Sequence, residues 1–360
     1  MSQKLDVAVL GATGTVGQRF IQLLAAHPWF RVAEVAASDR SAGKRYAEAT
    51  RWVLPGEPPT EIANLTVLPL DAAFKSPIVM SALPGDVAKT LEPTLAAAGH
   101  LVSSNTSANR MQTDVPLLLP EINADHVRLV DAQRRKGWAG ALVTMSNCTI
   151  VGTVVALAPL REFGIERISL VSMQAISGSG YPGVASFDIL DNVLPYIGGE
   201  EEKVETEPQK ILGALTEDKI VHLETRISAA CNRVPVMDGH TVCVSVGFKH
   251  KPTLAQIREA WENYQGHDLA RELPSFPKPV ITYSEGADRP QPRRDRDAGG
   301  GMTTTIGRLR ECSLLDYKFV TLSHNTVRGA AGGAILNAEL LVAQGYASHV
   351  MDTLEGAQTR

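Results

Sequence analysis

The chain has 360 residues, of which 44% are hydrophobic and 21% are charged, so it is long enough for two packed domains. Its formal net charge of -4, with Lys and Arg spread along the sequence, offers no basic surface for nucleic acid or for an anionic membrane. No run of eighteen apolar residues predicts a membrane span, and the N-terminus lacks the pattern of a secretion signal, so we expect a cytoplasmic protein.

The first part of the chain alternates between expected strands and helices. Buried strands are expected at 5–10, 31–38, 76–84 and 100–106. Helices are expected after the first of these strands, as far as residue 28, and at 86–99. Strands that alternate with helices indicate a parallel sheet covered on both faces. The predicted fold class is therefore α/β, with an N-terminal Rossmann-type dinucleotide-binding domain.

From residue 148 onward, expected strands follow one another with few helices between them. These strands are expected at 166–177, 226–235, 240–250, 280–286, 301–311 and 317–324. Helices are expected at 148–164, 251–265 and 327–345, and a polar loop at 287–301. This order predicts a second α+β domain with a mostly antiparallel sheet. We expect residues 1–147, completed by the C-terminal helix 325–360, to form one domain and residues 148–324 the other.

The segment GATGTVG directly follows the first expected strand and opens a helix. Its glycines have the spacing GxxGxxG, and small residues there let the backbone approach a pyrophosphate at the start of the helix. The expected cofactor-binding residues of this loop are Gly11, Thr13, Gly14, Thr15, Val16 and Gly17. The alternative is a glycine-rich turn that binds no ligand.

The segment ASDRSAGK follows the second expected strand, where an acidic side chain would bind the ribose of NAD. Instead, Ser38, Arg40, Ser41 and Lys44 place two cations and two hydroxyls in one short loop. Such groups pair well with a 2′-phosphate, so we predict NADP as the cofactor. The alternative is a solvated basic loop without a ligand.

Four scattered cysteines form no CxxC pair and lie near no His-rich cluster, so no metal site is expected. Cys148 stands at the expected start of a helix, where the helix dipole stabilises an anion and lowers a thiol pKa. We therefore consider Cys148 a candidate nucleophile, with a buried inert thiol as the alternative. For Cys231, Cys243 and Cys312, which lie in or beside apolar strands, we predict the inert role.

A nucleophilic cysteine needs a partner that moves protons. His240, in RVPVMDGHT, stands at the start of an expected strand, and Arg233 in the same segment offers a cation for a carboxylate. His324 is the alternative partner, and a purely structural role for His240 also stays open.

Several motifs occur together, in one order, along nearly the whole chain. They are GATGTVG, ASDRSAGK, SNCT, QAISGSGYPG, EEEKVETEPQKIL, NRVPVMDGHT and NTVRGAAGG. In these motifs the chain resembles the aspartate-semialdehyde dehydrogenase family, in its archaeal and fungal-like branch. Relatives often have Asn-Pro before the Asn-Cys pair, where this chain has Met145 and Ser146.

The resemblance implies an activity and a role for each matching residue. The implied reaction is the NADPH-dependent reductive dephosphorylation of 4-phospho-L-aspartate to L-aspartate 4-semialdehyde through a cysteine thioester. It belongs to the synthesis of lysine, threonine, methionine and isoleucine. The implied catalytic residues are Cys148 as nucleophile, His240 as acid and base, and Gln174 as the group that orients the substrate.

The resemblance also implies a substrate pocket. Arg233 would hold the α-carboxylate, Glu200 or its neighbour Glu201 would face the ammonium group, and Asn325 would lie by the nicotinamide. The implied phosphate-binding residues are Arg110, Asn147 and Lys203. The expected partners are this small substrate and free phosphate, together with a second copy of the chain in a homodimer or homotetramer.

Three rival functions remain open at this point. Two are homologous reductases, acting on a CoA thioester such as malonyl-CoA or on N-acetylglutamyl phosphate. The third is a non-catalytic NADP-binding sensor, although a sensor has no need for both Cys148 and His240.

Overall fold

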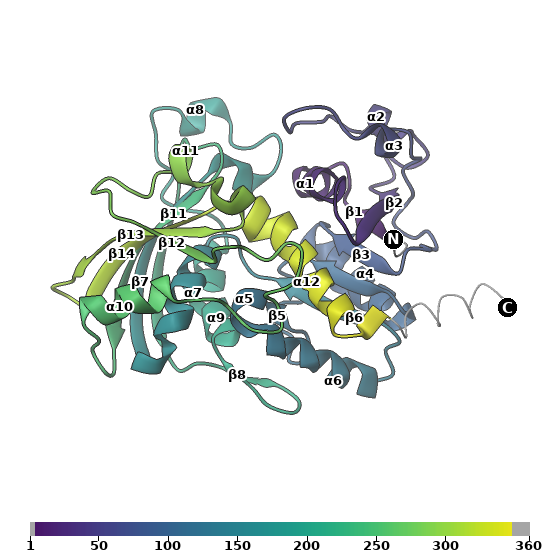
Figure 1. Ribbon diagram of the computed structural model, residues 1–360. Coiled ribbons are helices and arrows are strands. Elements are labelled where there is room, and N and C mark those ends of the chain that lie inside the picture. The colour runs from purple at the N-terminus through teal and green to yellow at the C-terminus, as the bar shows by residue number, and fades with distance from the viewer. Residues whose placement is uncertain (1–3, 348–360) are drawn as a thin grey trace.

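A sheet of six parallel strands forms the centre of the N-terminal half (Figure 1). Its strands are β1 (Leu5–Leu10), β2 (Phe30–Ala36), β3 (Ile78–Ser81), β4 (Leu101–Ser104), β5 (Leu117–Leu118) and β6 (Ala141–Met145). Their order is β2-β1-β3-β4-β6-β5, so β2 and β3 lie on opposite sides of β1. Ligands of open parallel sheets bind beside such a switch, outside the carboxyl ends of the strands.

Helices cover both faces of this sheet, as the sequence predicts. On one face, α4 (Gly85–Ala98) packs against Val79 and Val102. On the other face, α1 (Thr15–Leu24) and α12 (Gly332–Ala343) pack against Val7 and Met80. The shorter helices of this half are α2 (Tyr46–Ala49), α3 (Thr60–Ala63), α5 (Pro120–Asn123), η1 (Ala124–Leu129) and α6 (Val130–Arg135). This computed structural model describes residues 4–347, and none of the helices within that range is long and apolar enough to cross a membrane.

A second sheet of six strands forms the other half of the molecule. Its strands are β7 (Ile165–Gln174), β10 (Arg226–Arg233), β11 (His240–Phe248), β12 (Ile281–Ser284), β13 (Thr304–Glu311) and β14 (Tyr317–Ser323). Their order is β10-β7-β11-β14-β13-β12. The three central pairings are antiparallel and the two edge pairings are parallel, which confirms the predicted α+β domain with a mostly antiparallel sheet.

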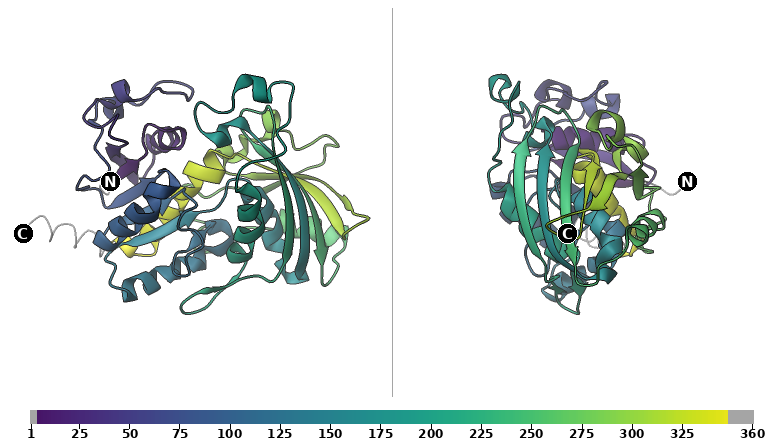
Figure 2. Two further views of the ribbon diagram at one scale, coloured as in Figure 1. Left: turned by 180° about the vertical axis from the view of Figure 1, so that it is seen from behind. Right: turned by 90° about the vertical axis from the view of Figure 1, so that its left-hand side faces the viewer.

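Helices cover only the inner face of the second sheet. There α7 (Val151–Leu157), η2 (Ala158–Phe163) and α10 (Leu254–Glu262) fill the space toward the first domain. Among residues 4–347, no helix lies over the outer face in the right-hand view of Figure 2. That face carries the exposed side chains of Val171, Ala230 and Cys243.

Several elements differ from those that the sequence predicts. The helix expected from Cys148 begins at Val151, after a turn, and becomes a 3-10 helix at Ala158. The polar loop 287–301 contains the short helices α11 (Pro292–Asp295) and η4 (Ala298–Gly301). The remaining elements are η3 (Ile176–Ser179), α8 (Ser186–Ile189), α9 (Glu200–Ile211), β8 (Ala214–Leu215), β9 (Ile220–Val221) and η5 (Val327–Ala331).

The C-terminal segment returns to the first domain, as predicted. It enters through η5, a π-helical turn, and continues as α12 against β4 and β6. Arg328 in η5 is fully buried, and its Nε donates a hydrogen bond of 2.7 Å to Glu121 Oε1. Breaking such a buried ion pair would leave a charge without compensation, so it holds η5 firmly against α5. Residues 348–360 of the predicted helix lie outside the described range, and the exact domain boundaries stay a prediction.

Candidate active site

A cavity of about 270 Å³ lies between the two domains and is lined by residues that follow β4, β6, β7 and β14. The structure brings together six of the predicted site residues in its wall, namely Val16, Arg110, Asn147, Cys148, Lys203 and Asn325. Its wall also includes Asn105, Ser107, Ser177 and Thr326, which the sequence reasoning did not single out. The candidate nucleophile therefore shares one cavity with a residue of the predicted cofactor loop.

Cys148 and His240 are in contact, although 92 residues separate them in the sequence. The Sγ atom of Cys148 lies 3.3 Å from Nε2 of His240. Cys148 follows β6, whereas His240 is the first residue of β11. No hydrogen bond joins the rival, His324, to Cys148 within the described part of the chain. The geometry therefore favours His240 as the partner of the sulfur.

The turn that carries Cys148 is held by its neighbour Asn147 and by α9. Asn147 Oδ1 accepts a hydrogen bond of 2.8 Å from the backbone N–H of Thr149, which closes the turn over the cysteine. The backbone N–H of Asn147 donates to Glu207 Oε2 at 2.7 Å. Cys148 thus stands three residues before the first helical residue, Val151, and not at the helix start that the sequence predicts.

Gly329 in η5 packs directly on the nucleophile. A Cβ atom at Gly329 would lie 2.8 Å from Cβ of Cys148, and the backbone around the cysteine would have to shift to admit it. The absence of a side chain at this position therefore allows η5 to form one wall of the cavity. The π-helical turn, which often marks functional sites, brings Gly329 to this point.

Burial dominates the ionisation of the Cys148–His240 pair. It raises the pKa of the Cys148 thiol to about 12, with a further rise from Glu200, while Arg110 and Arg233 oppose the change. Burial likewise lowers the pKa of His240 to about 3, and the nearby Arg233 and His324 add to that effect. The prediction of a lowered thiol pKa is thus wrong, because desolvation outweighs the field of a helix that begins beyond the cysteine.

The other nitrogen of His240 also has a partner. The backbone N–H of Ala175 donates a hydrogen bond of 3.0 Å to Nδ1 of the ring. Ala175 directly follows β7, and its carbonyl oxygen accepts a hydrogen bond of 2.7 Å from Nη1 of Arg233. One residue therefore positions both the imidazole and the guanidinium group predicted to bind a carboxylate.

Gln174, Arg233 and Glu200 lie around this centre rather than in the wall of the cavity. Gln174 is buried at the end of β7, beside Arg233 in the register with β10, and its Nε2 donates to Ser172 Oγ at 3.2 Å. Glu200 Oε1 accepts a hydrogen bond of 2.9 Å from Thr149 Oγ1. Its neighbour Glu201 instead accepts from the backbone N–H of Cys231, so Glu200 is the one that faces the nucleophile's turn.

One face of α9 supports the cationic side of the cavity. Lys203 lines the cavity, and Glu207 Oε1 accepts a hydrogen bond of 2.9 Å from Nη1 of Arg110. Lys210 donates to three backbone carbonyl oxygens of the segment that carries Arg110, at 2.7 to 2.8 Å. Sequence reasoning missed Glu207 and Lys210. The signal that could have found them is the helical spacing of the charged residues at 200, 203, 207 and 210.

The predicted cofactor loop has the close backbone approaches that a dinucleotide site requires. Gly11 has a φ of +72°, and a Cβ atom there would lie 2.4 Å from the carbonyl oxygen of Ala82. A Cβ atom at Gly17 would lie 2.3 Å from the carbonyl oxygen of Gly11, so only glycine lets α1 pack this close to the loop. No side chain caps the start of α1 at Gly14, which leaves its N–H groups for a pyrophosphate. These features fit NADP.

The loop after β2 lies beside the glycine-rich turn. The backbone N–H of Ala12 donates to the carbonyl oxygen of Ala36 at the end of β2, at 3.0 Å. Ser38 and Arg40 are exposed, and no ion pair involves Arg40 within residues 4–347. Lys44 instead directs its ammonium group to the carbonyl oxygen of Arg40, at 2.8 Å. Arg40 is therefore the better candidate for a 2′-phosphate.

Asn325 links two loops on the far side of the cavity. Its Oδ1 accepts from the backbone N–H of Gly239, and its Nδ2 donates to Ser177 Oγ, both at 2.8 Å. Beside it, the hydroxyl group of Thr326 is buried without a hydrogen-bond partner among the described residues. The predicted position of Asn325 by the nicotinamide stays a proposal. Its observed contacts show that it also holds the loop that precedes His240.

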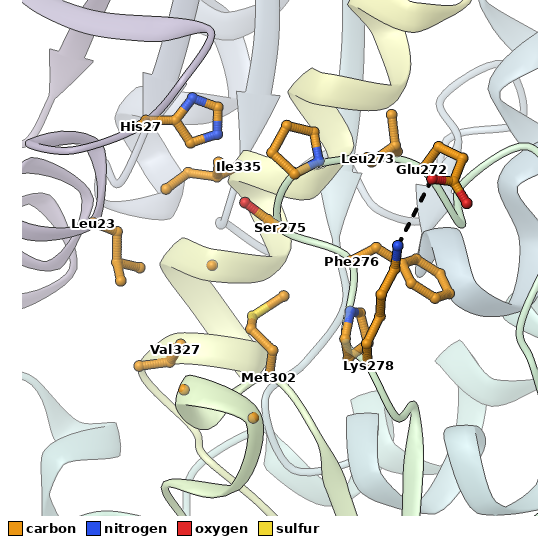
Figure 3. Close-up of a pocket in the computed structure, with 15 residues that line it drawn as sticks. Leu23, His27, Glu272, Leu273, Ser275, Phe276, Lys278, Met302, Val327 and Ile335 are labelled. Carbon is orange, nitrogen blue, oxygen red and sulfur yellow. Dashed lines mark ion pairs between the residues drawn. The ribbon is translucent and has the colours of Figure 1, made fainter.

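A second, larger cavity of about 520 Å³ contains none of the predicted site residues (Figure 3). Val327 of η5 lines it, while Gly329 of the same turn lines the smaller cavity. Its His27 is already engaged, because Nε2 lies 2.7 Å from Glu339 Oε1. No cysteine lines this cavity, so we place the chemistry in the smaller one. Among residues 4–347, no group of three or more His, Cys, Asp or Glu side chains could hold a metal ion.

Two of the three cysteines predicted to be buried are not buried. Cys231 is buried in β10, but Cys243 is exposed on the outer face of the second sheet, and Cys312 is partly exposed after β13. The alternation of side chains along a strand places Cys243 on that face, which no other element of the described chain covers. Burial opposes ionisation of Cys312, but hydrogen bonds from the N–H groups of Leu315 and Leu314 and from Ser245, together with the charge of Lys318, outweigh it and lower its pKa.

Both halves of the chain match families of known proteins. Residues 6–130 match the family described as "Semialdehyde dehydrogenase, NAD binding domain". Residues 157–328 match the family described as "Semialdehyde dehydrogenase, dimerisation domain". The two domains thus belong to the semialdehyde dehydrogenases, a class of proteins with an NAD-binding domain and a separate dimerisation domain.

Curated relatives and solved structures show which family within this class the chain belongs to. Aspartate-semialdehyde dehydrogenase of Archaeoglobus fulgidus is 48% identical over 94% of this chain and 98% of its own. The enzyme of Saccharomyces cerevisiae is 43% identical over 96% of this chain and 99% of its own. A crystal structure of aspartate-semialdehyde dehydrogenase with NADP from Candida albicans has a TM-score of 0.88 and 40% identity, covering 96% of this chain and 100% of that one. The chain belongs to the aspartate-semialdehyde dehydrogenase family.

The opposite pKa shifts of Cys148 and Cys312 predict which thiol reacts first with iodoacetamide. Because only the thiolate is alkylated, Cys312 should be labelled before Cys148 at pH 8, and labelling of Cys148 should still accelerate from pH 8 to pH 10. Peptide mapping by mass spectrometry measures both rates, with Cys312→Ser as the control for peptide assignment. Labelling of Cys148 first, at a rate independent of pH, would show that its sulfur is already an anion.

Proposed function

We propose that this chain catalyses the NADPH-dependent conversion of 4-phospho-L-aspartate to L-aspartate 4-semialdehyde and phosphate. The observation that carries the proposal is the 3.3 Å contact between Cys148 and His240 in a cavity shared with Val16 of the cofactor loop. This product supplies the synthesis of lysine, threonine, methionine and isoleucine. Membership of the aspartate-semialdehyde dehydrogenase family supports the same conclusion.

The charges around the sulfur suit a substrate with a carboxylate, an ammonium group and an acyl phosphate. Arg233 would pair with the α-carboxylate, and Glu200 with the ammonium group. Arg110 and Lys203 would hold the phosphate, with Asn147 beside them. Glu207 already accepts from Arg110 on its far side, so the guanidinium group is oriented before any substrate arrives.

Cys148 divides the reaction into two steps. Its sulfur attacks the acyl carbon of the substrate, phosphate leaves, and a thioester joins the substrate to the enzyme. The glycine-rich loop and Arg40 would hold NADPH, which would supply the hydride that reduces this thioester. The resulting thiohemiacetal on Cys148 then releases the aldehyde and restores the sulfur.

The rival functions fit these contacts less well. A CoA thioester brings no phosphate to the acyl carbon, so the substrate would offer no anionic group to Lys203 and Arg110 there. A regulatory sensor has no use for a nucleophile held against an imidazole. Catalysis by Cys148 also requires a reduced thiol, which supports a cytoplasmic location.

We further propose that the outer face of the second sheet joins two copies of the chain. The face is open, and Val171, Ala230 and Cys243 expose small and apolar side chains on the adjacent strands β7, β10 and β11. The matching dimerisation-domain family supports this assignment. A pairing of two such dimers would give the homotetramer.

The first prediction of this proposal concerns turnover. The protein should reduce NADP when given aspartate semialdehyde and phosphate, and CoA should not replace phosphate. Cys148→Ala should lower the rate at least ~10³-fold because no covalent intermediate can form, while the dissociation constant for NADP stays the same. Cys312→Ala is the matched control and should keep full activity. Substantial activity in Cys148→Ala would eliminate the thioester route.

A second prediction concerns the cofactor. Arg40→Ala should raise the KM for NADPH about 10-fold or more, since one charge-assisted hydrogen bond is lost, and should leave the KM for NADH unchanged. Arg45→Ala removes an exposed cation from the same segment without touching the predicted site and is the control. Equal changes in the KM for NADPH and the KM for NADH would mean that Arg40 does not bind the 2′-phosphate.

A third prediction concerns assembly. Sedimentation equilibrium should give a mass of two or four chains of 38.6 kDa. Val171→Glu should shift the distribution toward the monomer, because a carboxylate would be buried without a partner. Val221→Glu places the same charge at an exposed position on the β8-β9 hairpin and should leave assembly intact. A monomeric wild-type protein would refute the interface.

A further inference from the structure

The side chain of Arg328 joins η5 to two elements of the first domain. It is fully buried, and its Nε donates a hydrogen bond of 2.7 Å to Glu121 Oε1 in α5. Nη2 donates to the same oxygen atom. Nη1 lies 3.9 Å from Sδ of Met145, the last residue of β6. Because Cys148 stands three residues after Met145, one guanidinium group connects η5 with the segment that leads to the nucleophile.

The pair that Arg328 forms with Glu121 is poorly suited to stabilising the fold. Both of its N–H contacts go to Oε1, whereas Oε2 of Glu121 is buried without a hydrogen-bond partner among residues 4–347. The thioether sulfur of Met145 is only a weak acceptor for Nη1. Removing two charges from water is costly, and an incompletely bonded pair recovers only part of that cost, which apolar side chains of similar volume would avoid. The pair therefore points to a role in placing its neighbours rather than in stability.

The turn η5 depends on contacts outside itself. It is π-helical, and the backbone N–H of Gly329 donates a hydrogen bond of 2.9 Å to the carbonyl oxygen of His324, five residues earlier. Because π-helices are rare and occur mostly as single turns, the local sequence alone does not favour this conformation. Arg328 carries the only polar side chain among residues 327–331. Its contact with Glu121 is thus the side-chain hydrogen bond that holds the turn.

The backbone next to Arg328 packs directly on the nucleophile. A Cβ atom at Gly329 would lie 2.8 Å from Cβ and 3.0 Å from Cα of Cys148, so no side chain fits between the two residues. A Cβ atom at Gly333, about one turn further on, would lie 2.6 Å from both Arg328 Nη1 and Met145 Sδ. No side chain therefore separates this backbone from the cysteine or from the guanidinium group. A displacement of Arg328 would be passed on to Cys148.

We propose that Arg328 is a positioning residue for the reaction, because its contact with Glu121 sets how closely η5 packs on Cys148 and thereby where the sulfur stands relative to the acyl carbon. The proposal rests on the proposed function, in which Cys148 attacks that carbon. Arg328 does not line the cavity and acts only through its neighbours. A displacement of about 1 Å at a reacting atom lowers a rate by about 10²-fold, so even a small relaxation of η5 would be measurable.

The groups expected to bind the substrate have anchors of their own. Arg233 donates to the carbonyl oxygen of Ala175 in the second domain, and Arg110 donates to Glu207 in α9. Neither contact involves η5. Loss of the Arg328 contact should therefore lower kcat and leave the KM for the substrate nearly unchanged, whereas a general loosening of the fold would change both.

Kinetics of a paired substitution test this separation. Arg328→Met together with Glu121→Leu removes both charges and fills their space with apolar atoms, so the protein should fold. We expect kcat to fall about 10²-fold, with the KM for aspartate semialdehyde and the dissociation constant for NADP within about 3-fold of the wild type. Arg258→Met is the control, because it removes an ion-paired arginine from α10, outside the cavity, and should leave kcat unchanged. A wild-type kcat in the paired variant, or a KM that rises as much as kcat falls, would overturn the proposal.

A single substitution, Arg328→Lys, decides the question if the paired variant does not fold. Lysine retains the positive charge beside Glu121 but offers a flexible ammonium group in place of a planar, rigid fork. We expect kcat to fall about 10-fold, with the KM again unchanged, because the turn η5 would be held less precisely. A wild-type kcat in this variant would show that the guanidinium group does not set the position of the sulfur and would contradict the proposal.

Alkylation of Cys148 tests the placement of the sulfur without any substrate. At one fixed pH, we expect iodoacetamide to label Cys148 about 10-fold faster in the paired variant than in the wild type, since a displaced η5 uncovers it, while Cys231 in β10 stays as protected as before. Equal rates for Cys148 in both proteins, or a rise that Cys231 shares, would refute the positioning role. Absence of phosphate-dependent NADP reduction by the wild type would refute the proposed function and leave this measurement valid.

Discussion

The site depends on the contact between a thiol from the first domain and an imidazole from the second. Cys148 follows β6 of the parallel sheet, and His240 begins β11 of the mixed sheet. β11 pairs with β14, so that His240 lies opposite Ser323, and the chain then passes into η5, where Gly329 packs on Cys148. The pair of strands β11 and β14 therefore positions both the imidazole of His240 and the turn η5, which packs on Cys148. Any change in their register would separate the two reacting groups.

A neutral thiol in this position is consistent with the substrate that the site is proposed to bind. A preformed thiolate would repel an acyl phosphate that arrives with two negative charges, and both would occupy one cavity of about 270 Å³. Burial of Cys148 raises the pKa of its thiol, so the anion is disfavoured before a substrate binds. Arg110 and Arg233 offset part of the desolvation, so the anion stays accessible as a transient species.

The parts of this structure that the sequence could predict are those with local signals. The strand, glycine-rich turn and helix at the N-terminus, and the alternating strands of the second sheet, follow from the periodicity of apolar residues. The choice of His240 over His324 depends on strand register, which one sequence does not encode locally. The exposure of Cys243 depends on which face of a sheet stays open. The prediction of a lowered thiol pKa is wrong because an argument from the helix dipole omits desolvation. Desolvation depends on every element packed around Cys148.

The helix α9 explains how a buried cationic pocket can exist before its anion arrives. Glu200 accepts a hydrogen bond from Thr149 and Lys203 lines the cavity. Glu207 and Lys210, one and two turns further along the same face, bind the backbone and side chains that shape the pocket. Burial lowers the pKa of Lys210 to about 8, but three carbonyl oxygens still satisfy its ammonium group. Arg110 donates three hydrogen bonds to protein acceptors, one of which is the carboxylate of Glu207. The carboxylate of Glu207 thereby compensates the charge of Arg110. The guanidinium group is held in one orientation and needs no reorganisation when a phosphate binds.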